Sequence, residues 1–307
     1  MQARDYHPDL RRQVDRFNCE ACQRHKLDGR GFGLLPERNI SEMPWQDVAV
    51  DLIGPWRIPI NDRLYEFNAL TCIDPVTNLT ELVRIDSKTS EHVRMKFEQC
   101  WLARYPWPRN CIHDNGGEFT GWEFQELLQT LGIKDVPTTS RNPQSNAICE
   151  RMHQTVGNIL RTTIHTNPPH NVTQARTLVD GALSTAMHAM RASVSTTLVG
   201  SPGALVFHRD MFLNIPLIAD WHLIATRREQ LVNESLRRHN LKRRTYDYVI
   251  GQKVLKKVHD PTKLGERTEG PYTIQTVHVN GTVSIELAPG IIERINIRRV
   301  IPYRETT

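Results

Sequence analysis

The stretch Trp45-Gln46-Asp47-Val48-Ala49-Val50-Asp51-Leu52-Ile53 decides the fold, because it is typical of a buried β-strand and has Asp51 close to its end. Residues 64–73 and 79–85 are two further apolar runs of strand length. The turn residues of segment 74–78, Asp-Pro-Val-Thr-Asn, separate them. Three consecutive strands therefore open this part of the chain.

Helices and short strands alternate after the third strand. The pattern predicts helices over 90–104, 120–131 and 174–191, a long helix after the polar loop Thr138–Asn146, and short strands over 110–113 and 133–136. This order indicates an α/β domain in which helices cover a mixed sheet.

The last third of the chain has a different sequence pattern from the part before it. Residues 217–246 are helical in pattern and rich in charge, and the chain then has short alternating strands around the hairpin turn Asn280-Gly281. These strands fall at 254–258, 272–279, 282–287 and 291–297. They predict a small all-β barrel.

The C-terminal third also differs in charge. From Arg209 onward there are 17 Lys and Arg against 11 Asp and Glu, whereas the preceding residues have 22 Lys and Arg against 23 Asp and Glu. The excess favours a polyanionic partner, and a solvated basic face without a partner is the alternative.

The first forty residues are polar and contain a cysteine pair. Cys19 and Cys22 indicate half of a metal site or a redox motif, because a disulfide does not persist in a reducing compartment. Segment 29–33 has the composition of a flexible connector. No apolar run is long enough to span a bilayer, and the start lacks the apolar core of a signal peptide. We therefore expect the protein to stay inside the cell.

Three acids have the chemistry that phosphodiester transfer requires. Two Mg²⁺ ions can activate the attacking oxygen and stabilise the leaving one, and carboxylates are the hard ligands that these ions prefer. Asp51 and Asp114 follow predicted strands, and Glu150 lies in the first turn of the long helix. Glu150 lies opposite the apolar stripe of that helix, where most Glu side chains are simply solvated. Spacing alone decides nothing, since pairs of acids at this separation arise by chance.

The segments around the three acids resemble a known family. They are Val50-Asp51-Leu52-Ile53-Gly54-Pro55, His113-Asp114-Asn115-Gly116-Gly117-Glu118-Phe119 and Asn142-Pro143-Gln144-Ser145-Asn146-Ala147-Ile148-Cys149-Glu150-Arg151. Their order and spacing resemble the three motifs of retroviral and gypsy-class retrotransposon integrases. Further resemblances lie at segment 19–24, at 200–207, at Gly270-Pro271-Tyr272, which is similar to the GPY/F motif, and at 297–303. The resemblance therefore covers essentially the whole chain.

This resemblance implies an RNase H-like core with a mixed five-stranded sheet, followed by a small C-terminal all-β barrel. It implies that Asp51, Asp114 and Glu150 bind two Mg²⁺ or Mn²⁺ ions. Asn115 and the segment with Asn142, Gln144 and Asn146 would contact the DNA end. Where relatives often have lysines four and seven residues after the catalytic acid, this chain has Gln154 and Gly157. Phosphate contacts would then fall to Arg151, His153 or Arg161.

Zinc is the second point at which the chain departs from the family pattern. The two histidines of the family's zinc module would precede Met1, and Cys19 and Cys22 supply only two of the four ligands of a closed structural site. We therefore expect no zinc unless His7, His25 or a partner completes the site, and we expect residues 1–40 to be loosely packed.

The sequence thus predicts four segments. They are a remnant of the zinc module with its linker (1–40), the catalytic core (41–208), a charged helical linker (209–246) and a barrel (247–307). The expected activity is 3′-end processing and strand transfer of element DNA into target DNA, in the nucleus, by a homo-oligomer that binds double-stranded DNA and no membrane. Arg243, Arg244, Lys256 and Lys257 are expected to hold DNA, and chromatin is a possible second partner. The alternatives are an inactive or host-adopted copy that only binds DNA or chromatin, and a general RNase H-type nuclease.

Overall fold

The computed structural model describes residues 20–25, 29–37, 43–61, 63–137, 147–195, 198–259 and 261–304, and describes only the backbone of residues 147–151. The chain forms two compact units. The core unit is Asn39–Gln230, and the terminal unit is Met1–Arg38 together with Leu231–Thr307. Among the helices described, none is long and apolar enough to cross a membrane.

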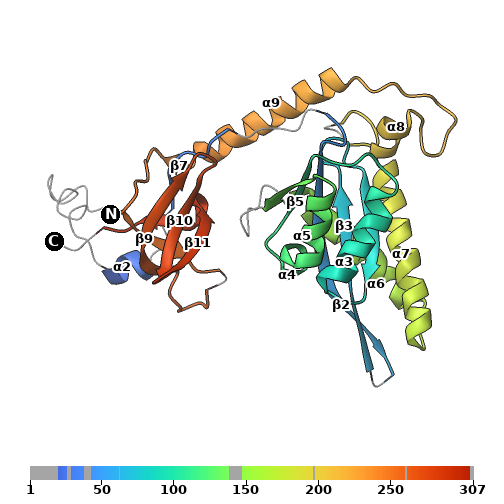
Figure 1. Cartoon of the computed structure of the whole chain (residues 1–307), viewed down its shortest axis with the longest axis horizontal. Coiled ribbons are helices and arrows are strands. Elements are labelled where there is room, and N and C mark those ends of the chain that lie inside the picture. The colour runs from blue at the N-terminus through green and yellow to red at the C-terminus, as the bar shows by residue number, and fades with distance from the viewer. Residues whose placement is uncertain are drawn as a thin grey trace, which may run out of the picture. The chain divides into compact units, whose positions relative to one another are not determined.

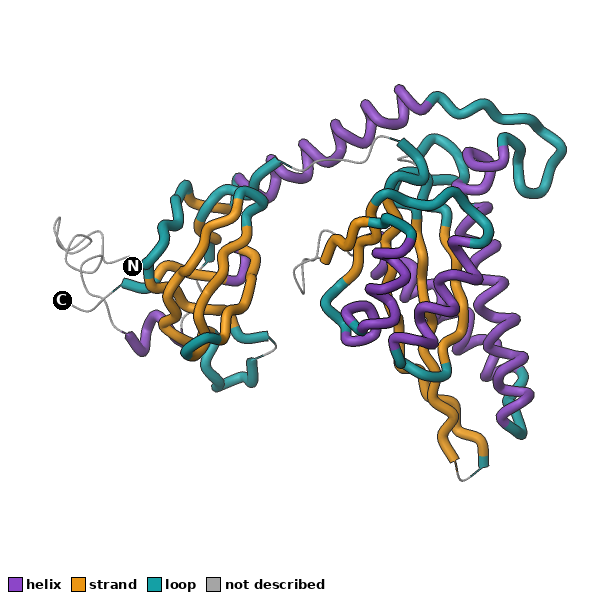
Figure 2. The backbone as a smooth tube through the Cα atoms, viewed as in Figure 1, coloured by secondary structure: helices purple, strands orange, loops and turns teal. Residues whose placement is uncertain are grey.

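The core unit is built on a mixed five-stranded sheet with strand order β4-β3-β2-β5-β6. β2 pairs antiparallel with β3 and parallel with β5, so that β2 is the central strand. The strands are β2 (Asp47–Ile60), β3 (Arg63–Ile73), β4 (Thr80–Ile85), β5 (Asn110–His113) and β6 (Lys134–Pro137). β2 and β3 continue together as a hairpin beyond the rest of the sheet (Figures 1 and 2). The α/β fold with a mixed sheet is confirmed.

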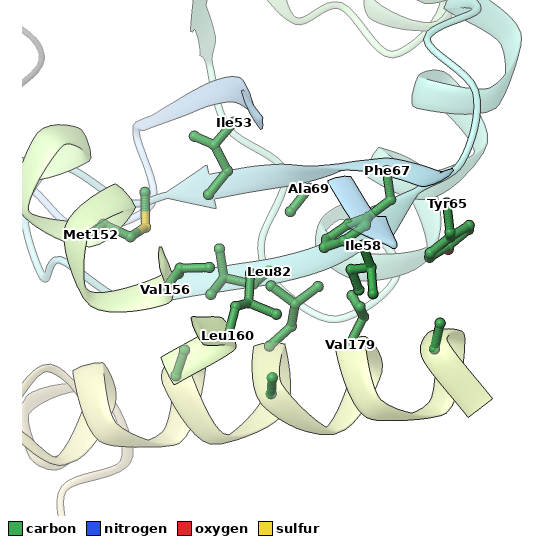
Figure 3. Close-up of a cluster of buried hydrophobic side chains, with 14 of the residues drawn as sticks. Ile53, Ile58, Tyr65, Phe67, Ala69, Leu82, Met152, Val156, Leu160 and Val179 are labelled. Atoms are coloured by element: carbon green, nitrogen blue, oxygen red, sulfur yellow. The ribbon is translucent and has the colours of Figure 1, made fainter. Parts of the chain in front are cut away.

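Helices cover both faces of this sheet, because side chains alternate between the faces along each strand. On one face, Leu70 and Cys72 of β3 belong to a core cluster with Phe97 and Phe124. On the other face, Phe67 and Ala69 of the same strand belong to a second cluster with the two long helices (Figure 3). The helices are α3 (Ser90–Phe97), the π-helical turn η2 (Glu98–Leu102), α4 (Gly117–Thr120), α5 (Trp122–Thr130), α6 (Ala147–Thr166), α7 (Val172–Ala192) and α8 (Pro202–Phe207).

The apolar stripe of α6 forms the contact with the sheet, as its helical spacing predicts. Met152, Val156 and Leu160 are buried and, as Figure 3 shows, lie among side chains from the strands. Val179 of α7 adds to the same cluster. The face of α6 opposite this stripe includes the exposed residue Gln154.

The terminal unit has a five-stranded antiparallel sheet with strand order β11-β10-β9-β8-β12. Its strands are β8 (Lys253–Lys257), β9 (Thr268–His278), β10 (Thr282–Ala288), β11 (Ile291–Asn296) and β12 (Val300–Pro302), with the short 3-10 helix η3 (Ile297–Arg299) between the last two. The predicted hairpin turn joins β9 to β10, and Gly281 has the positive φ of 73° that such a turn requires. The predicted small all-β domain is confirmed. Helix α9 (Trp221–Asn240) precedes it within the predicted charged helical segment.

The N-terminal residues contribute to the terminal unit, contrary to the expectation of a loosely packed remnant. β1 (Gly31–Phe32) pairs in parallel with β7 (Arg243–Arg244), and Phe32 and Leu35 are buried in the core of the C-terminal sheet. The connector predicted from the glycines of segment 29–33 is therefore wrong from Gly31 onward. The composition gave no sign of this pairing, because the partner strand lies about two hundred residues away.

The helix α2 (Glu20–His25) also contacts this unit. Arg24 donates a hydrogen bond of 2.6 Å to the carbonyl of Gly270, and the amide of Arg267 donates one of 3.0 Å to the carbonyl of Arg24. Gln23 forms two hydrogen bonds with the backbone of Arg304. The bond to Gly270 ties α2 to β9 at the Gly-Pro-Tyr segment, and the others tie α2 to Arg267, directly before β9, and to Arg304, after β12.

Candidate active site

Asp51 lies in the central strand and faces the two long helices. Val48 and Val50 point into the cluster on the opposite face, so the alternation of the strand turns Asp51 toward α6. The strand does not end near Asp51, as the sequence suggested, but continues through a bulge between Ile53 and Trp56 to Ile60. Asp51 is thus held in the middle of a paired strand.

Asp114 lies beside Asp51 because their strands are parallel neighbours. Ala49 of β2 is in register with Ile112 of β5, and each acid follows its register partner by two residues. Neighbouring strands lie about 4.8 Å apart. The carboxylate of Asp114 accepts a hydrogen bond of 3.0 Å from the amide of Gly116, which fixes the turn directly after β5.

The two carboxylates repel one another. Burial first, then the charge of Asp114 and to a smaller extent that of Glu118, together raise the pKa of Asp51 from 3.8 to about 6, against a backbone hydrogen bond from Leu52 that lowers it. The side chain of Asp51 is 27% exposed. A partly buried site with several like charges favours either a proton or a cation at Asp51.

Glu118 is a member of this acidic group that sequence reasoning did not single out. It lies in the first turn of α4, directly after Asp114 and the glycine pair. A Cβ at position 116 would lie 2.9 Å from the Cδ of Glu118 and 3.0 Å from the Oδ1 of Asp114. Glycine at this position therefore lets the two acids approach each other. The only signal in the sequence was that Glu118 belongs to the motif of Asp114.

Helix α6 presents His153 to this site. The Nε2 of His153 lies 3.8 Å from the Oδ2 of Asp51, and its side chain is 37% exposed. The backbone of Glu150 lies in the same helix, one turn earlier, but its side chain and that of Arg151 lie outside the described residues. The predicted convergence of all three acids thus stays a prediction, whereas Asp51 and Asp114 are brought together.

The residues expected to contact the DNA end differ in how the structure describes them. Asn115 is exposed next to Asp114. Arg161 is exposed and donates to the carbonyl of Gly157 and to the side chain of Asn158 in its own helix. Three further residues lie outside the described residues, namely Asn142, Gln144 and Asn146.

Two of the four basic residues expected to hold DNA in the terminal unit are engaged within the protein. Arg243 donates hydrogen bonds to the carbonyls of Gly33, Phe32 and Ile297, and so fastens β1. The Nζ of Lys256 lies 2.7 Å from Glu293 and 3.2 Å from Glu269, and its side chain is only 15% exposed.

The other two basic residues differ from one another in exposure. Arg244 is exposed with its guanidinium 4.9 Å from the ring centroid of Phe32, and Lys257 is half-buried. Arg244 is therefore better placed than Arg243 to reach a ligand.

The cysteine half-site is described only in part. Cys22 is half-buried in α2, and Cys19 and His7 lie outside the described residues. Within the described part of the chain, no group of three or more His, Cys, Asp or Glu residues could hold a metal ion.

Known proteins are similar to this chain in sequence and in fold. The Tf2-3 and Tf2-4 transposon polyproteins of Schizosaccharomyces pombe are each 27% identical over 164 residues, which is 52% of this chain and 12% of each polyprotein. The chain thus spans only a small part of the length of these relatives. No protein-family model matches it.

The fold is similar to that of a chain in the cryo-EM structure of the simian T-cell lymphotropic virus intasome in complex with PP2A regulatory subunit B56 gamma. The TM-score is 0.64 at 14% identity, over 99% of this chain and 94% of that chain. The catalytic core domain of HTLV-2 integrase, solved in complex with magnesium, matches with a TM-score of 0.41 at 18% identity, over 56% of this chain and 97% of that domain. The transposon relatives and the intasome fold confirm the resemblance that the three motifs carry.

Proposed function

We propose that this chain, an integrase of the long-terminal-repeat retrotransposon type by its relatives and its fold, trims the 3′ ends of element DNA and joins them to target DNA. The observation that carries the proposal is the pair of Asp51 on β2 and Asp114 directly after β5, which the parallel pairing of the two strands holds side by side beneath the start of α6. Such a pair on rigid strands suits in-line phosphoryl transfer, in which positioning and charge stabilisation supply most of the catalysis.

The donor set fits divalent cations. The raised pKa of Asp51 reflects burial and uncompensated neighbouring carboxylates, and such a site gains most from a divalent cation. Asp51, Asp114 and Glu150 would hold two Mg²⁺ or Mn²⁺ ions, which would activate the attacking oxygen and stabilise the leaving one. We expect Glu150 to join the set, since it precedes His153 by three positions on α6 and residues three apart share a helix face.

The chain's own residues have separate tasks in this proposal. The amide of Gly116 orients the carboxylate of Asp114, and His153 lies where it can contact Asp51 or a nearby phosphate. Asn115, exposed beside Asp114, would contact the DNA end together with Asn142, Gln144 and Asn146. Arg151 and Arg161 would bind phosphates, because Gln154 and Gly157 supply no positive charge.

We further propose that the enzyme works on double-stranded DNA in the nucleus as a homo-oligomer. The basic terminal unit would hold DNA without reading its sequence, because Lys and Arg that contact phosphates carry no base code. Chromatin is a second candidate partner for the same unit. Zinc would bind only if another chain or segment completes the Cys19 and Cys22 half-site.

The first prediction is that Asp114→Asn abolishes both processing and strand transfer and leaves DNA affinity within about threefold, because it removes a metal-binding charge from an exposed turn. The assay uses terminal-repeat oligonucleotides with Mg²⁺ or Mn²⁺. Asp47→Asn is the matched control. Asp47 lies four residues before Asp51 on the same strand, and its carboxylate accepts a 2.7 Å hydrogen bond from Asn110. Strand transfer by Asp114→Asn at the rate of Asp47→Asn would refute the assignment.

The alternative proposal is an inactive copy that only binds DNA or chromatin. The same assay separates the two, because an inactive copy binds DNA and gives no product with either metal. A general RNase H-type nuclease would cut DNA without joining it, and the terminal unit with its Gly-Pro-Tyr segment argues against that reading.

A further inference from the structure

His113 occupies an unusual place for a polar side chain. It is the last residue of β5, directly before Asp114, and its side chain is fully buried. Its ring lies between aromatic neighbours, with centroid distances of 5.3 Å to Phe119 and 6.1 Å to Phe124. An apolar ring would suffice for this packing, so the two ring nitrogens need a separate explanation.

Both nitrogens contact acceptors. Nδ1 is hydrogen-bonded to the backbone carbonyl of Asp114, and Nε2 to a carboxylate oxygen of Asp135. A carbonyl oxygen only accepts, so Nδ1 carries the hydrogen of the first bond. Asp135 lies on β6, and β6 pairs in parallel with β5. The ring therefore links the neighbouring strand to the main chain of a proposed metal-binding acid.

We propose that His113 is a positioning residue for Asp114. Asp135 holds the ring of His113, and the Nδ1–H of that ring holds the carbonyl of Asp114. The main chain at Asp114 is thereby fixed, so that the carboxylate of Asp114 is directed toward Asp51. This inference rests on the proposed function only for its effect on activity. The structural part of the inference is that His113 fixes the turn from Asp114 to Gly116, and this part can be tested without any enzymatic activity.

Two conservative variants separate the contacts of the two ring nitrogens of His113. In His113→Asn, the side-chain amide nitrogen can take the position of Nδ1 and still donate to the carbonyl of Asp114. In His113→Gln, the amide nitrogen can instead take the position of Nε2 and donate to Asp135. His113→Phe keeps the aromatic packing against Phe119 and removes both ring nitrogens.

The decisive readout is hydrogen exchange at the amide of Gly116, which donates to the carboxylate of Asp114. We expect the amide hydrogen of Gly116 to exchange at least about tenfold faster in His113→Gln and His113→Phe than in the wild type. In His113→Asn, we expect its exchange rate to stay within about threefold of the wild-type rate. Partners that orient metal ligands typically contribute 10–100-fold to activity or metal affinity. We therefore expect kcat for strand transfer to fall about 10–100-fold in His113→Gln, with the KM for DNA unchanged.

Thermal unfolding of all three variants shows whether each one folds. Equal exchange at Gly116 in the Asn and Gln variants, or activity that follows only their melting temperatures, would overturn the positioning role. If the wild type itself joins no DNA, the proposed function fails, and the Gly116 exchange still decides whether His113 fixes Asp114. If the wild type is active and Gly116 exchange is the same in every variant, only the positioning role fails.

Discussion

At the scale of single residues, Asp51 is an acid whose surroundings oppose its charge. Its pKa is raised to about 6 by burial first and by Asp114 and Glu118 next. Between pH 4 and 6 the unfolded chain releases this proton while the folded chain retains it, so folding stability falls as pH rises through this window. Below pH 4 both states hold the proton, and above pH 6 the loss is complete.

Asp51→Asn should therefore stabilise the metal-free protein at pH 7. A rise in pKa from 3.8 to about 6 corresponds to about 3 kcal/mol at most, and partial solvent exposure lowers this, so we expect about 1–2 kcal/mol. Urea unfolding in EDTA between pH 4 and 7 measures the difference. Added Mn²⁺ should stabilise the wild type and not Asp51→Asn, with Asp47→Asn again as the control. Equal pH profiles for wild type and Asp51→Asn would contradict the electrostatic picture.

The motifs predicted Asp51 and Asp114 as site residues, because metal binding restricts which residue types can occupy these positions. They did not predict Glu118 as a neighbour of both acids, since its position depends on the close approach that Gly116 allows. Nor could they predict that Lys256 is paired, because Glu293 lies 37 positions away on another strand. Side-chain partners that are distant in sequence are fixed by the way the whole sheet folds, which no local pattern contains.

At the scale of elements, α2 is held to β9 mainly through Arg24. Its guanidinium bonds to the carbonyl of Gly270 and lies 2.8 Å from Glu20. We predict that Arg24→Ala releases α2, so that the amides of Arg267 and Arg304, which donate to α2, exchange at least about tenfold faster. The melting temperature should fall only slightly, since few buried apolar contacts are lost.

Arg30→Ala is the matched control for this release, because Arg30 is exposed in the same N-terminal segment. Exchange that is unchanged in Arg24→Ala would mean that α2 is held by its other bonds, such as those of Gln23. A change in both variants would point to general loosening of the segment instead.

Long helices and most strands, including the four-residue strand β5, could be predicted from the sequence, and the two-residue strands β1 and β7 could not. The periodic stripe of α6 and the turn at Gly281 carry local signals that the structure confirms. β1 has two residues and no periodicity, and its stability comes from β7 and from burial of Phe32. The continuation of β2 beyond Ile53 was hidden by Gly54 and Pro55, which normally end a strand and here form a bulge.

At the scale of the whole molecule, we predict that DNA binding weakens steeply with salt, whatever the DNA sequence. Each phosphate contact contributes about 0.9 to the slope of log K against log salt. The full chain is required for this titration, because a fragment that begins at residue 217 would lack Phe32 and Leu35 from the core of the C-terminal sheet.

The same titration compares variants of exposed basic residues with a variant of a basic residue that is paired with acids. Replacing the exposed Arg237 and Lys242 by Ala should lower the slope by about 2. Lys256→Met should leave it unchanged, because its ammonium is already paired with Glu269 and Glu293. A slope that is flat in the wild type, or lowered only by Lys256→Met, would refute DNA holding by these exposed residues.

The pairing of β1 with β7 also sets an order of events on the ribosome. Phe32 and its partner Arg243 are 211 positions apart, so at about 5–20 residues per second the first strand emerges roughly 10–40 s before its partner. The core unit is synthesised entirely within that interval and can fold first. A nascent chain that stalls inside α9 would therefore display a folded core unit beside an unsatisfied Phe32–Leu35 segment, a ready target for chaperones or proteases.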